Sequence, residues 1–350
     1  MDNIEIVEGD AKMSMKPINR LDTDNEVGNF RVLFMGDIHD GSEVAVKTPD
    51  FIRNNREDGL KVPIPNNPIQ DIMYSEWVNM CDVIGKVNLV VLMGDMCDGI
   101  NFKSEGVGTW TTRMDEQISD ASNLLNMIDA DNYIGVKGSR YHIKDNMTAD
   151  ELVLKELGYR GNRTKWYDDE EVVGENDYEV HMDYDMRLEL EELNFNLRHW
   201  LSTTKSTFMY RPTKIAREML KLQTSTQTLG EFDFVMRAHV HKYLYLDIDS
   251  EIVGVTLPCW KGRDDMVRRS ISDAASNGWF LMDIDGDSFT RYNRSFHLPI
   301  NYNIQCMSFS RPSYNGDAPK RENDLHIAPP KTEEVVPKQP QEAIDGRKIA

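Results

Sequence analysis

The residues best suited to chemistry in this sequence are aspartates and histidines that stand two positions apart. Asp37 and His39 form one such pair, and His239 and His241 form another. In an extended chain, side chains two positions apart point to the same side. A carboxylate and imidazoles placed in this way can bind a divalent cation. Taken alone, either pair would also suit a surface turn or a buried histidine pair.

A second candidate segment is Gly94-Asp95-Met96-Cys97-Asp98-Gly99. The two oxygens of the Asp95 carboxylate could each face a cation, so Asp95 could bridge two of them. Asp98 could orient a metal ligand without binding metal itself. Segments rich in glycine and aspartate are also typical of turns closed by an aspartate side chain, and this segment alone favours that interpretation.

Two more histidines follow stretches with strand character. The segment Gly138-Ser139-Arg140-Tyr141-His142 comes shortly after an apolar run, and His199 ends an alternating stretch next to Trp200. The alternatives are a core or surface histidine at position 199 and a histidine that merely lies near the site at position 142. Their place at strand ends is what makes them candidates.

The pattern of apolar residues predicts the strands that carry these segments. Short apolar runs over 30–36, 87–93 and 133–136 each lead to a glycine and suit buried strands, and residues 193–199 alternate as a strand does. Further strands are expected over 232–236 and near 251–257 and 278–284. The candidate ligands therefore lie at strand ends.

Helical spacing of apolar residues predicts helices over 69–85, 109–130 and 212–222. Thr109 is the expected cap of the second. Thr148 and Glu151 form a capping box for another short helix, which ends near Gly158. Strands alternate with helices early and follow one another later, which predicts a mixed α/β sandwich rather than a doubly wound sheet.

Composition suggests three regions in the chain. We expect an irregular lead-in over 1–28, a folded domain over 29–308 with an acidic excursion at about 160–186, and a disordered tail over 309–350 that is rich in proline and charge. The 350 residues have a formal net charge of −19, which argues against wrapping a long duplex by charge alone.

The cysteines and the apolar runs bear on the compartment. The four cysteines form no CxxC pair, and no apolar run has the length of a membrane span or of a signal peptide. We therefore expect a cytoplasmic protein with free thiols and no membrane partner, located in the host cytoplasm if the source is viral. The oligomeric state stays open.

Taken together, Asp-x-His, Gly-Asp-x-x-Asp and His-x-His in this order at strand ends resemble the calcineurin-like metallophosphoesterase superfamily. The resemblance covers about residues 31–241 and extends towards residue 300. It implies a four-layer α/β-β/α sandwich of two mixed sheets flanked by helices. It also implies two divalent cations, from Mn, Fe, Zn or Ni, with Mn favoured.

The resemblance assigns roles to individual residues. Asp37, His39 and His241 would bind the first cation, His199 and His239 the second, and Asp95 both. The third motif departs from the family pattern, because Ser139 occupies the place of an asparagine ligand and the histidine comes three residues later. Divergent, phage-like members have a similar Gly-Ser-x-x-His segment. His142 is therefore assigned to the active site, either as proton donor or as the missing ligand.

The implied activity is hydrolysis of a phosphoester by a hydroxide that bridges the two metals. A phosphodiester substrate is expected, and nucleic acid, the substrate of a nuclease, is a candidate. A phosphomonoesterase acting on proteins or nucleotides is the alternative, and a scaffold with little or no catalysis is a second one. Arg140 and Arg211 are candidate phosphate contacts. Lys261 and Arg263 belong to a local basic patch that could serve the same purpose.

Overall fold

In the computed structural model the chain divides into two units, Met1–Tyr302 and Asn303–Ala350. The structure describes residues 5–8, 12–13, 29–54, 59–100, 106–139, 143–144, 147–159, 166–168, 171–174, 182–201, 211–224, 231–248, 252–263, 275–296 and 298, all in the first unit. The expected tail over 309–350 lies outside the described residues. No described helix is both long and apolar enough to cross a membrane.

Two mixed sheets form the centre of the first unit. The larger sheet comprises β1 (Glu5–Glu8), β2 (Lys12–Met13), β3 (Phe30–Met35), β6 (Val87–Leu92), β7 (Ala130–Val136), β12 (Met182–Asp183), β18 (Asn277–Asp285) and β19 (Ser288–Phe296). They are ordered β12-β7-β6-β3-β18-β19-β1-β2. Strands β3, β6 and β7 run parallel, whereas β18 is antiparallel to β3.

The smaller sheet comprises β13 (Met186–Leu190), β14 (Leu193–Arg198), β15 (Phe234–Arg237), β16 (Leu244–Ile248) and β17 (Ile252–Thr256), in the order β13-β14-β15-β17-β16. Its central strands β14, β15 and β17 are parallel. Three two-stranded ribbons complete the strands: β4 (Phe51–Asn54) with β5 (Lys61–Ile64), β8 (Ile143–Lys144) with β9 (Met147–Thr148), and β10 (Trp166–Asp168) with β11 (Glu171–Gly174).

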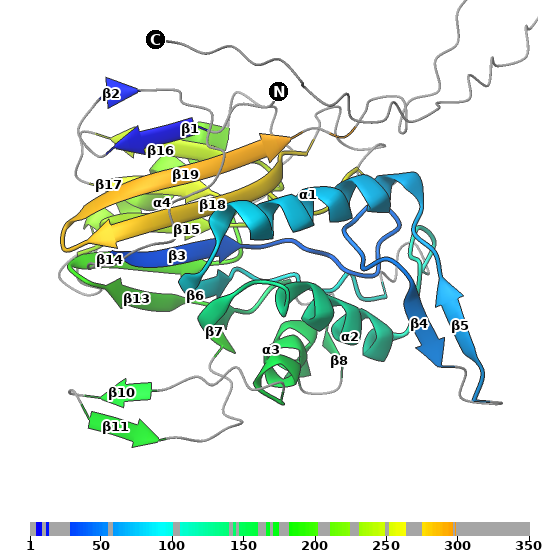
Figure 1. Ribbon diagram of the computed structural model, residues 1–350. Coiled ribbons are helices and arrows are strands. Elements are labelled where there is room, and N and C mark those ends of the chain that lie inside the picture. Colours follow the sequence, from blue (N-terminus) through cyan, green and yellow to red (C-terminus); the bar gives the residue numbers. More distant parts are fainter. Residues whose placement is uncertain are drawn as a thin grey trace, which may run out of the picture. The chain divides into compact units, whose positions relative to one another are not determined.

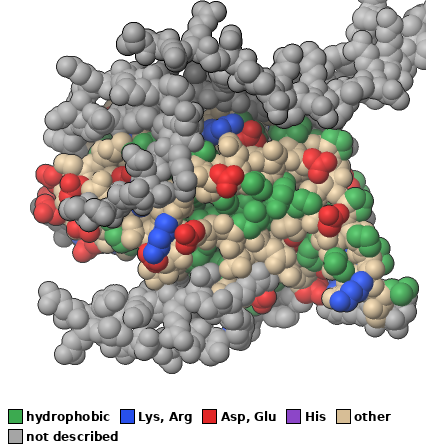
Figure 2. All heavy atoms as spheres, viewed as in Figure 1, with side chains coloured by type: hydrophobic (Ala, Val, Ile, Leu, Met, Phe, Trp, Pro, Cys, Tyr) green, Lys and Arg blue, Asp and Glu red, His purple; other side chains and the backbone are tan. Residues whose placement is uncertain are grey.

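Helices cover both outer faces of the sheet pair (Figure 1). They are α1 (Pro68–Ile84), α2 (Met114–Leu125), α3 (Ala149–Tyr159) and α4 (Arg211–Thr224). The face of the molecule that contains α1 and α2 carries a group of hydrophobic side chains among scattered charged ones (Figure 2).

Alternation of side chains along the strands creates three separate core layers. On β3, Val32 and Phe34 pack between the two sheets, whereas Leu33 and Met35 pack towards α1 and α2. A third cluster lies between α4 and the smaller sheet and includes Ile215 and Met219. Period-two alternation sends successive residues to opposite faces, so one strand serves two layers. The predicted four-layer sandwich of two mixed sheets is confirmed.

Local capping explains two of the helices. Asn67 caps α1 and forms a capping box with Gln70, and Pro68 stands in the first turn. Thr148 and Glu151 form the predicted capping box at the start of α3.

Several sequence expectations differ from the structure. Helix α2 begins at Met114 rather than at residue 109, because Thr109 pairs with Ser42 in an isolated bridge and its hydroxyl donates to the carbonyl of Gly106. Within the expected irregular lead-in, β1 and β2 add to the edge of the larger sheet next to β19. The end of the acidic excursion forms part of the larger sheet, because β12 pairs with β7.

Candidate metal centre

The candidate ligands come from both sheets and meet at one end of the sandwich. Asp37 and His39 follow β3 and Asp95 follows β6, both in the larger sheet. His199 follows β14, and His239 and His241 follow β15, in the smaller sheet. Ligands at the carboxyl ends of neighbouring parallel strands are brought to a common edge, as is usual for sites on α/β sheets.

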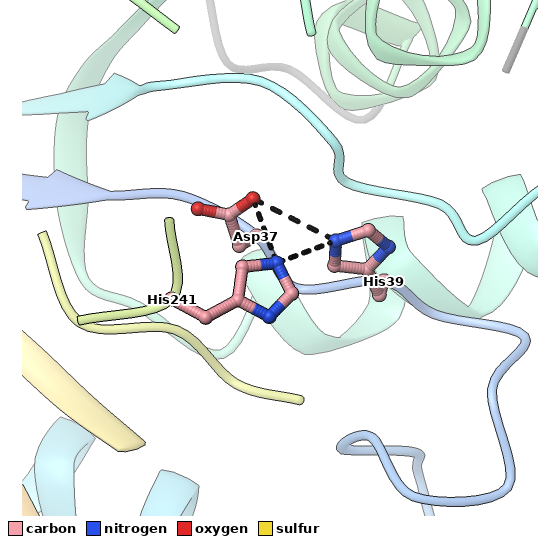
Figure 3. Close-up of side chains that lie close together, drawn as sticks. All are labelled: Asp37, His39 and His241. Atoms are coloured by element: carbon pink, nitrogen blue, oxygen red, sulfur yellow. Dashed lines mark hydrogen bonds and ion pairs between the residues drawn. The ribbon is translucent and has the colours of Figure 1, made fainter. Parts of the chain in front are cut away.

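The first cluster consists of Asp37, His39 and His241 (Figure 3). Nε2 of His241 lies 3.2 Å from Oδ1 of Asp37, and Nε2 of His39 lies 3.6 Å from the same oxygen. The two Nε2 atoms are 3.1 Å apart. Three potential ligand atoms therefore face a common point.

The second cluster consists of Asp95, His199 and His239. Nε2 of His199 lies 3.1 Å from Oδ2 of Asp95 and 3.2 Å from Nδ1 of His239. Oδ2 of Asp95 also lies 3.9 Å from Nε2 of His39, which belongs to the first cluster. Asp95 is thus next to both clusters, which is the position required of a bridging carboxylate.

The backbone at the site is held in an unfavourable conformation. Five of the seven non-glycine residues with positive φ in the described chain are candidate ligands, and these are Asp37, His39, Asp95, His239 and His241, with φ between 52° and 68°. Non-glycine residues adopt this left-handed region at a cost, and such residues concentrate at functional sites. The fold therefore holds these side chains in place against local preference.

Contacts behind the histidines set the direction of their lone pairs. Nδ1 of His199 lies 2.6 Å from the carbonyl oxygen of Met93, which can only accept, so this nitrogen carries a proton. Nδ1 of His39 lies 3.0 Å from Oδ1 of Asp98. In both rings Nε2 is left to face its cluster, which is the arrangement seen around metal-bound histidines.

Asp98 is itself held by a buried lysine. Nζ of Lys261 lies 2.6 Å from Oδ1 of Asp98, and both residues are buried. Burial raises the pKa of Asp98, but the charge of Lys261 and the contact with His39 outweigh it and hold the pKa below its usual range. The carboxylate behind His39 is therefore ionised. The expectation that Lys261 belongs to a basic surface patch is wrong, because its side chain is buried against Asp98.

The loops that carry the ligands approach each other closely. A Cβ atom at Gly138 would lie 2.2 Å from Oδ1 of Asp95, and one at Gly94 would lie 2.5 Å from the Cα atom of Gly138. Asp150 of α3 joins the same loops, since its two carboxylate oxygens accept hydrogen bonds from the amides of Met96 and Gly138, both at 2.8 Å. Only glycine fits at these contacts.

Ser139 contacts Asp95 and takes part in the site through that residue. Its amide donates to Oδ1 of Asp95 at 2.6 Å, and its hydroxyl lies 3.1 Å from each carboxylate oxygen. These contacts orient the carboxylate that faces both clusters.

The histidines of the second cluster differ in their pKa, and therefore in their charge. Burial lowers the pKa of His199, but Asp95 outweighs it and raises the pKa to about 9. Burial and the nearby charge of His199 lower the pKa of His239 to about 4. Burial raises the pKa of Asp37, but His241 and His39 hold it well below its usual range. In this arrangement His199 is positively charged at neutral pH, and His239 is neutral.

The donor set fits divalent cations. Oδ1 of Asp37 is buried, yet it receives no hydrogen bond of good geometry and faces imidazole nitrogens instead. A buried carboxylate oxygen without a donor is costly unless a cation satisfies it. Two carboxylates and four imidazoles suit Mn, Fe, Zn or Ni better than Ca.

The side chains of three expected site residues lie outside what the structure describes. His142 and Arg140 lie outside the described residues, and Arg211 begins α4, where its side chain is not described. Sequence reasoning missed the parts of Asp150 and Trp200. Asp150 lies between Thr148 and Glu151, the two residues of the capping box of α3. Trp200 packs against His239 with ring centroids 4.1 Å apart. Trp200 stands next to His199, so its position was the available signal.

Comparison with known proteins gives distant structural likenesses. No family model and no curated protein matches the chain. The fold is similar to that of Zn²⁺-complexed Vps29 from Entamoeba histolytica, with 13% identity, coverage of 76% of this chain and 92% of that chain, and a TM-score of 0.37. An archaeal phosphodiesterase has 12% identity, with coverage of 77% of this chain and 100% of that chain and a TM-score of 0.36. A predicted phosphoesterase from Streptococcus pneumoniae has 13% identity, with coverage of 78% of this chain and 99% of that chain and a TM-score of 0.31. At this level of likeness, activity has to be derived from the residues of this chain.

Proposed function

We propose that this protein is a phosphoesterase that uses two divalent cations, with Mn²⁺ favoured. Asp37, His39 and His241 would hold one cation, His199 and His239 the other, and Asp95 both. The observation that carries the proposal is the convergence of six ligand-type side chains from two sheets, five of them on left-handed backbone. The order of the motifs, which resembles calcineurin-like metallophosphoesterases, supports the same function.

The cations would supply positive charge to the phosphoryl oxygens and would lower the pKa of an attacking water. The chain's own residues position this chemistry. Asp98 keeps Nε2 of His39 directed to its cluster, and the carbonyl of Met93 does the same for His199. Ser139 fixes the carboxylate of Asp95. We assign to His142 the proton that the leaving oxygen requires.

The favoured substrate is a phosphodiester. A diester has an organic group on each side of the phosphorus, and a pocket of about 530 Å³ lined partly by His199 and Ser139 provides space for one of them beside the second cluster. A phosphomonoesterase is the second candidate, because the same metal ligands serve monoesters. A scaffold that keeps the fold without catalysis is the third.

The first experiment compares two chromogenic esters in the presence of Mn²⁺. Bis(p-nitrophenyl) phosphate reports diester hydrolysis, and p-nitrophenyl phosphate reports monoester hydrolysis. We expect the diester to be hydrolysed faster, with loss of at least about a hundredfold in Asp95→Asn, because catalysis by metal ions requires the bridging charge. Bound metal is measured on the same samples, and about two ions per chain are expected.

The control variant is Asp131→Asn, an exposed carboxylate paired with Lys86 on the surface. It should leave both activity and metal content unchanged. His142→Ala should lower turnover while the metal content stays at two if His142 donates the proton, whereas loss of one ion would make it a ligand. Faster monoester turnover would favour the phosphomonoesterase. Fewer than one bound ion and no turnover of either ester would exclude the enzyme and leave the scaffold.

A further inference from the structure

A pocket with aromatic walls opens beside the second cluster. It has a volume of about 530 Å³ and is lined by residues that include Lys137, Ser139, Tyr184, Arg198, His199 and Trp200. His199 belongs to the Asp95 cluster, and Ser139 bonds to Asp95. A group in this pocket could therefore belong to the same molecule as a phosphate that is bound at this cluster. Pockets of this size hold small organic ligands.

Trp200 presents an open aromatic face at this pocket. Its ring lies against that of His239, with centroids 4.1 Å apart and planes tilted by 31°, and the residue is 45% exposed. Contact with His239 covers part of the indole and restrains it. A large apolar ring that stays exposed while it is fixed in place is a stacking platform, and leaving it in water has no structural benefit.

Tyr184 supplies a second aromatic side chain, and it is 41% exposed. Nζ of Lys137 lies 5.6 Å from the centre of its ring and 2.9 Å from Oε1 of Glu151. These contacts hold Tyr184 from one side by a cation–π interaction. Trp200 and Tyr184 are the two exposed aromatic residues among the large exposed hydrophobic side chains of the described chain, and both line this pocket.

The two basic side chains that line the pocket, Arg198 and Lys137, already form ion pairs. Arg198 forms an ion pair with Asp185, which also lines the pocket, and Lys137 is paired with Glu151. A second phosphate would need free positive charge, and it would be repelled by Asp185. A neutral planar group meets no such penalty. The lining therefore selects for an uncharged aromatic group.

We propose that this pocket binds the nucleobase of a nucleoside phosphodiester, stacked on Trp200. This inference rests on the proposed phosphodiesterase function, and it narrows the substrate to nucleotide esters. A nucleobase is planar, uncharged and separated from its phosphate by a sugar, so it can occupy the pocket while the phosphate stays at the clusters. Stacking on an aromatic side chain requires no particular base sequence.

The test compares two esters with the same leaving group. Thymidine 5′-(p-nitrophenyl) phosphate carries a nucleoside, whose base would enter the pocket, where methyl p-nitrophenyl phosphate carries a methyl group. We expect kcat/KM to favour the thymidine ester, and the preference to fall about tenfold in Trp200→Ala. Leu220→Ala, which removes an exposed side chain of α4, should leave the preference unchanged. An equal loss on both esters in Trp200→Ala would overturn the proposal and limit Trp200 to supporting His239.

A binding measurement separates this inference from the proposed activity. The full-length protein is titrated with thymidine 5′-monophosphate and, in parallel, with ribose 5-phosphate, and tryptophan emission is recorded. We expect saturable quenching by the nucleotide alone, and its loss in Trp200→Ala. This result would uphold the pocket even if no ester were hydrolysed. Quenching that persists in the variant, or no quenching at all, would overturn it. Equal competition by phosphotyrosine would instead assign the pocket to aryl phosphates.

Discussion

Lys261 and Asp98 form a buried ion pair directly behind a candidate metal ligand, with Nζ and Oδ1 2.6 Å apart. The same carboxylate oxygen lies 3.0 Å from Nδ1 of His39. The lysine therefore acts on the candidate metal site through Asp98. Because the pair is separated by 163 residues in sequence, it also ties the loop after β6 to the segment after β17.

Removing the lysine should test this link. Lys261→Met leaves the buried charge of Asp98 uncompensated, and we expect a loss of about 3 kcal/mol in the free energy of unfolding. Affinity for Mn²⁺ should fall by about tenfold or more, because Asp98 no longer holds His39 as firmly. Urea denaturation and calorimetric titration measure the two effects.

The matched control is Lys86→Met, which breaks the exposed ion pair with Asp131. It should leave both quantities unchanged, since exposed pairs are screened by water. A Lys261→Met protein with unaltered metal affinity would show that Asp98 positions His39 without the lysine.

Metal binding should release protons. His199 has its pKa raised to about 9, and contacts with Cys259 and Asp37 raise that of His241 against the effect of burial. Both rings are protonated at pH 7 in the metal-free protein and must lose a proton to bind a cation. We expect release of about two protons per chain, measured by calorimetry in buffers of different ionisation enthalpy.

The sign of the pH dependence follows from the same shifts. Affinity should rise with pH between 6 and 9, by up to about tenfold per pH unit for each proton released. Without metal, the stabilisation from His199 is present below its unfolded pKa of about 6.5 and is lost as pH rises through about 9. His199→Gln should release one proton fewer. Affinity that is flat over this pH range would contradict the assignment of His199 as a ligand.

Asp150 should be needed to hold two ligand loops together. Asp150→Ala leaves the amides of Met96 and Gly138 without their acceptors. We expect a loss of about 2–4 kcal/mol in the free energy of unfolding, with weaker metal binding. Asp150→Asn keeps one acceptor oxygen and should give an intermediate loss by denaturant titration. Equal losses in both variants would mean that charge, rather than the two hydrogen bonds, is what matters.

Gly138 should tolerate no side chain. The Cβ atom of Gly138→Ala would meet Asp95 at 2.2 Å from Oδ1 and 2.3 Å from the amide nitrogen. We expect a loss of about 1–3 kcal/mol in stability together with weaker Mn²⁺ binding. Gly254→Ala is a useful comparison, because its Cβ would crowd Met219 and Ile215 of α4, away from the clusters. It should lower stability and leave metal affinity unchanged.

The sequence predicted the parts of the fold in which apolar pattern and burial coincide. The strands before the ligands are short apolar runs or, for β14, an alternating stretch, and all six candidate ligands are brought together as expected. Strand β19 was missed because polar Arg291 and Asn293 are buried in it and conceal the pattern. The side chain of Arg291 stacks 3.5 Å from the ring centre of Tyr245 on another strand. Partners of that kind are set by tertiary contact, which local sequence does not encode.

Lys261 shows the same limit within the site. A lysine in a stretch of basic residues suggests a surface patch, and only its distant partner Asp98 makes burial acceptable. Trp200 likewise looked like an ordinary neighbour of His199. The pocket in which we propose a role for Trp200 is formed by strands and loops from separate parts of the chain.

The left-handed backbone at the ligands has a consequence for how this sequence can drift. At Asp37, His39, Asp95, His239 and His241, exchange for glycine would relieve conformational strain, so random mutation has an easy route to a more stable protein with no metal site. A lineage that used the fold only as a docking platform would have been free to take that route. This chain has aspartate or histidine, and not glycine, at all five positions, as the proposed binding of cations requires.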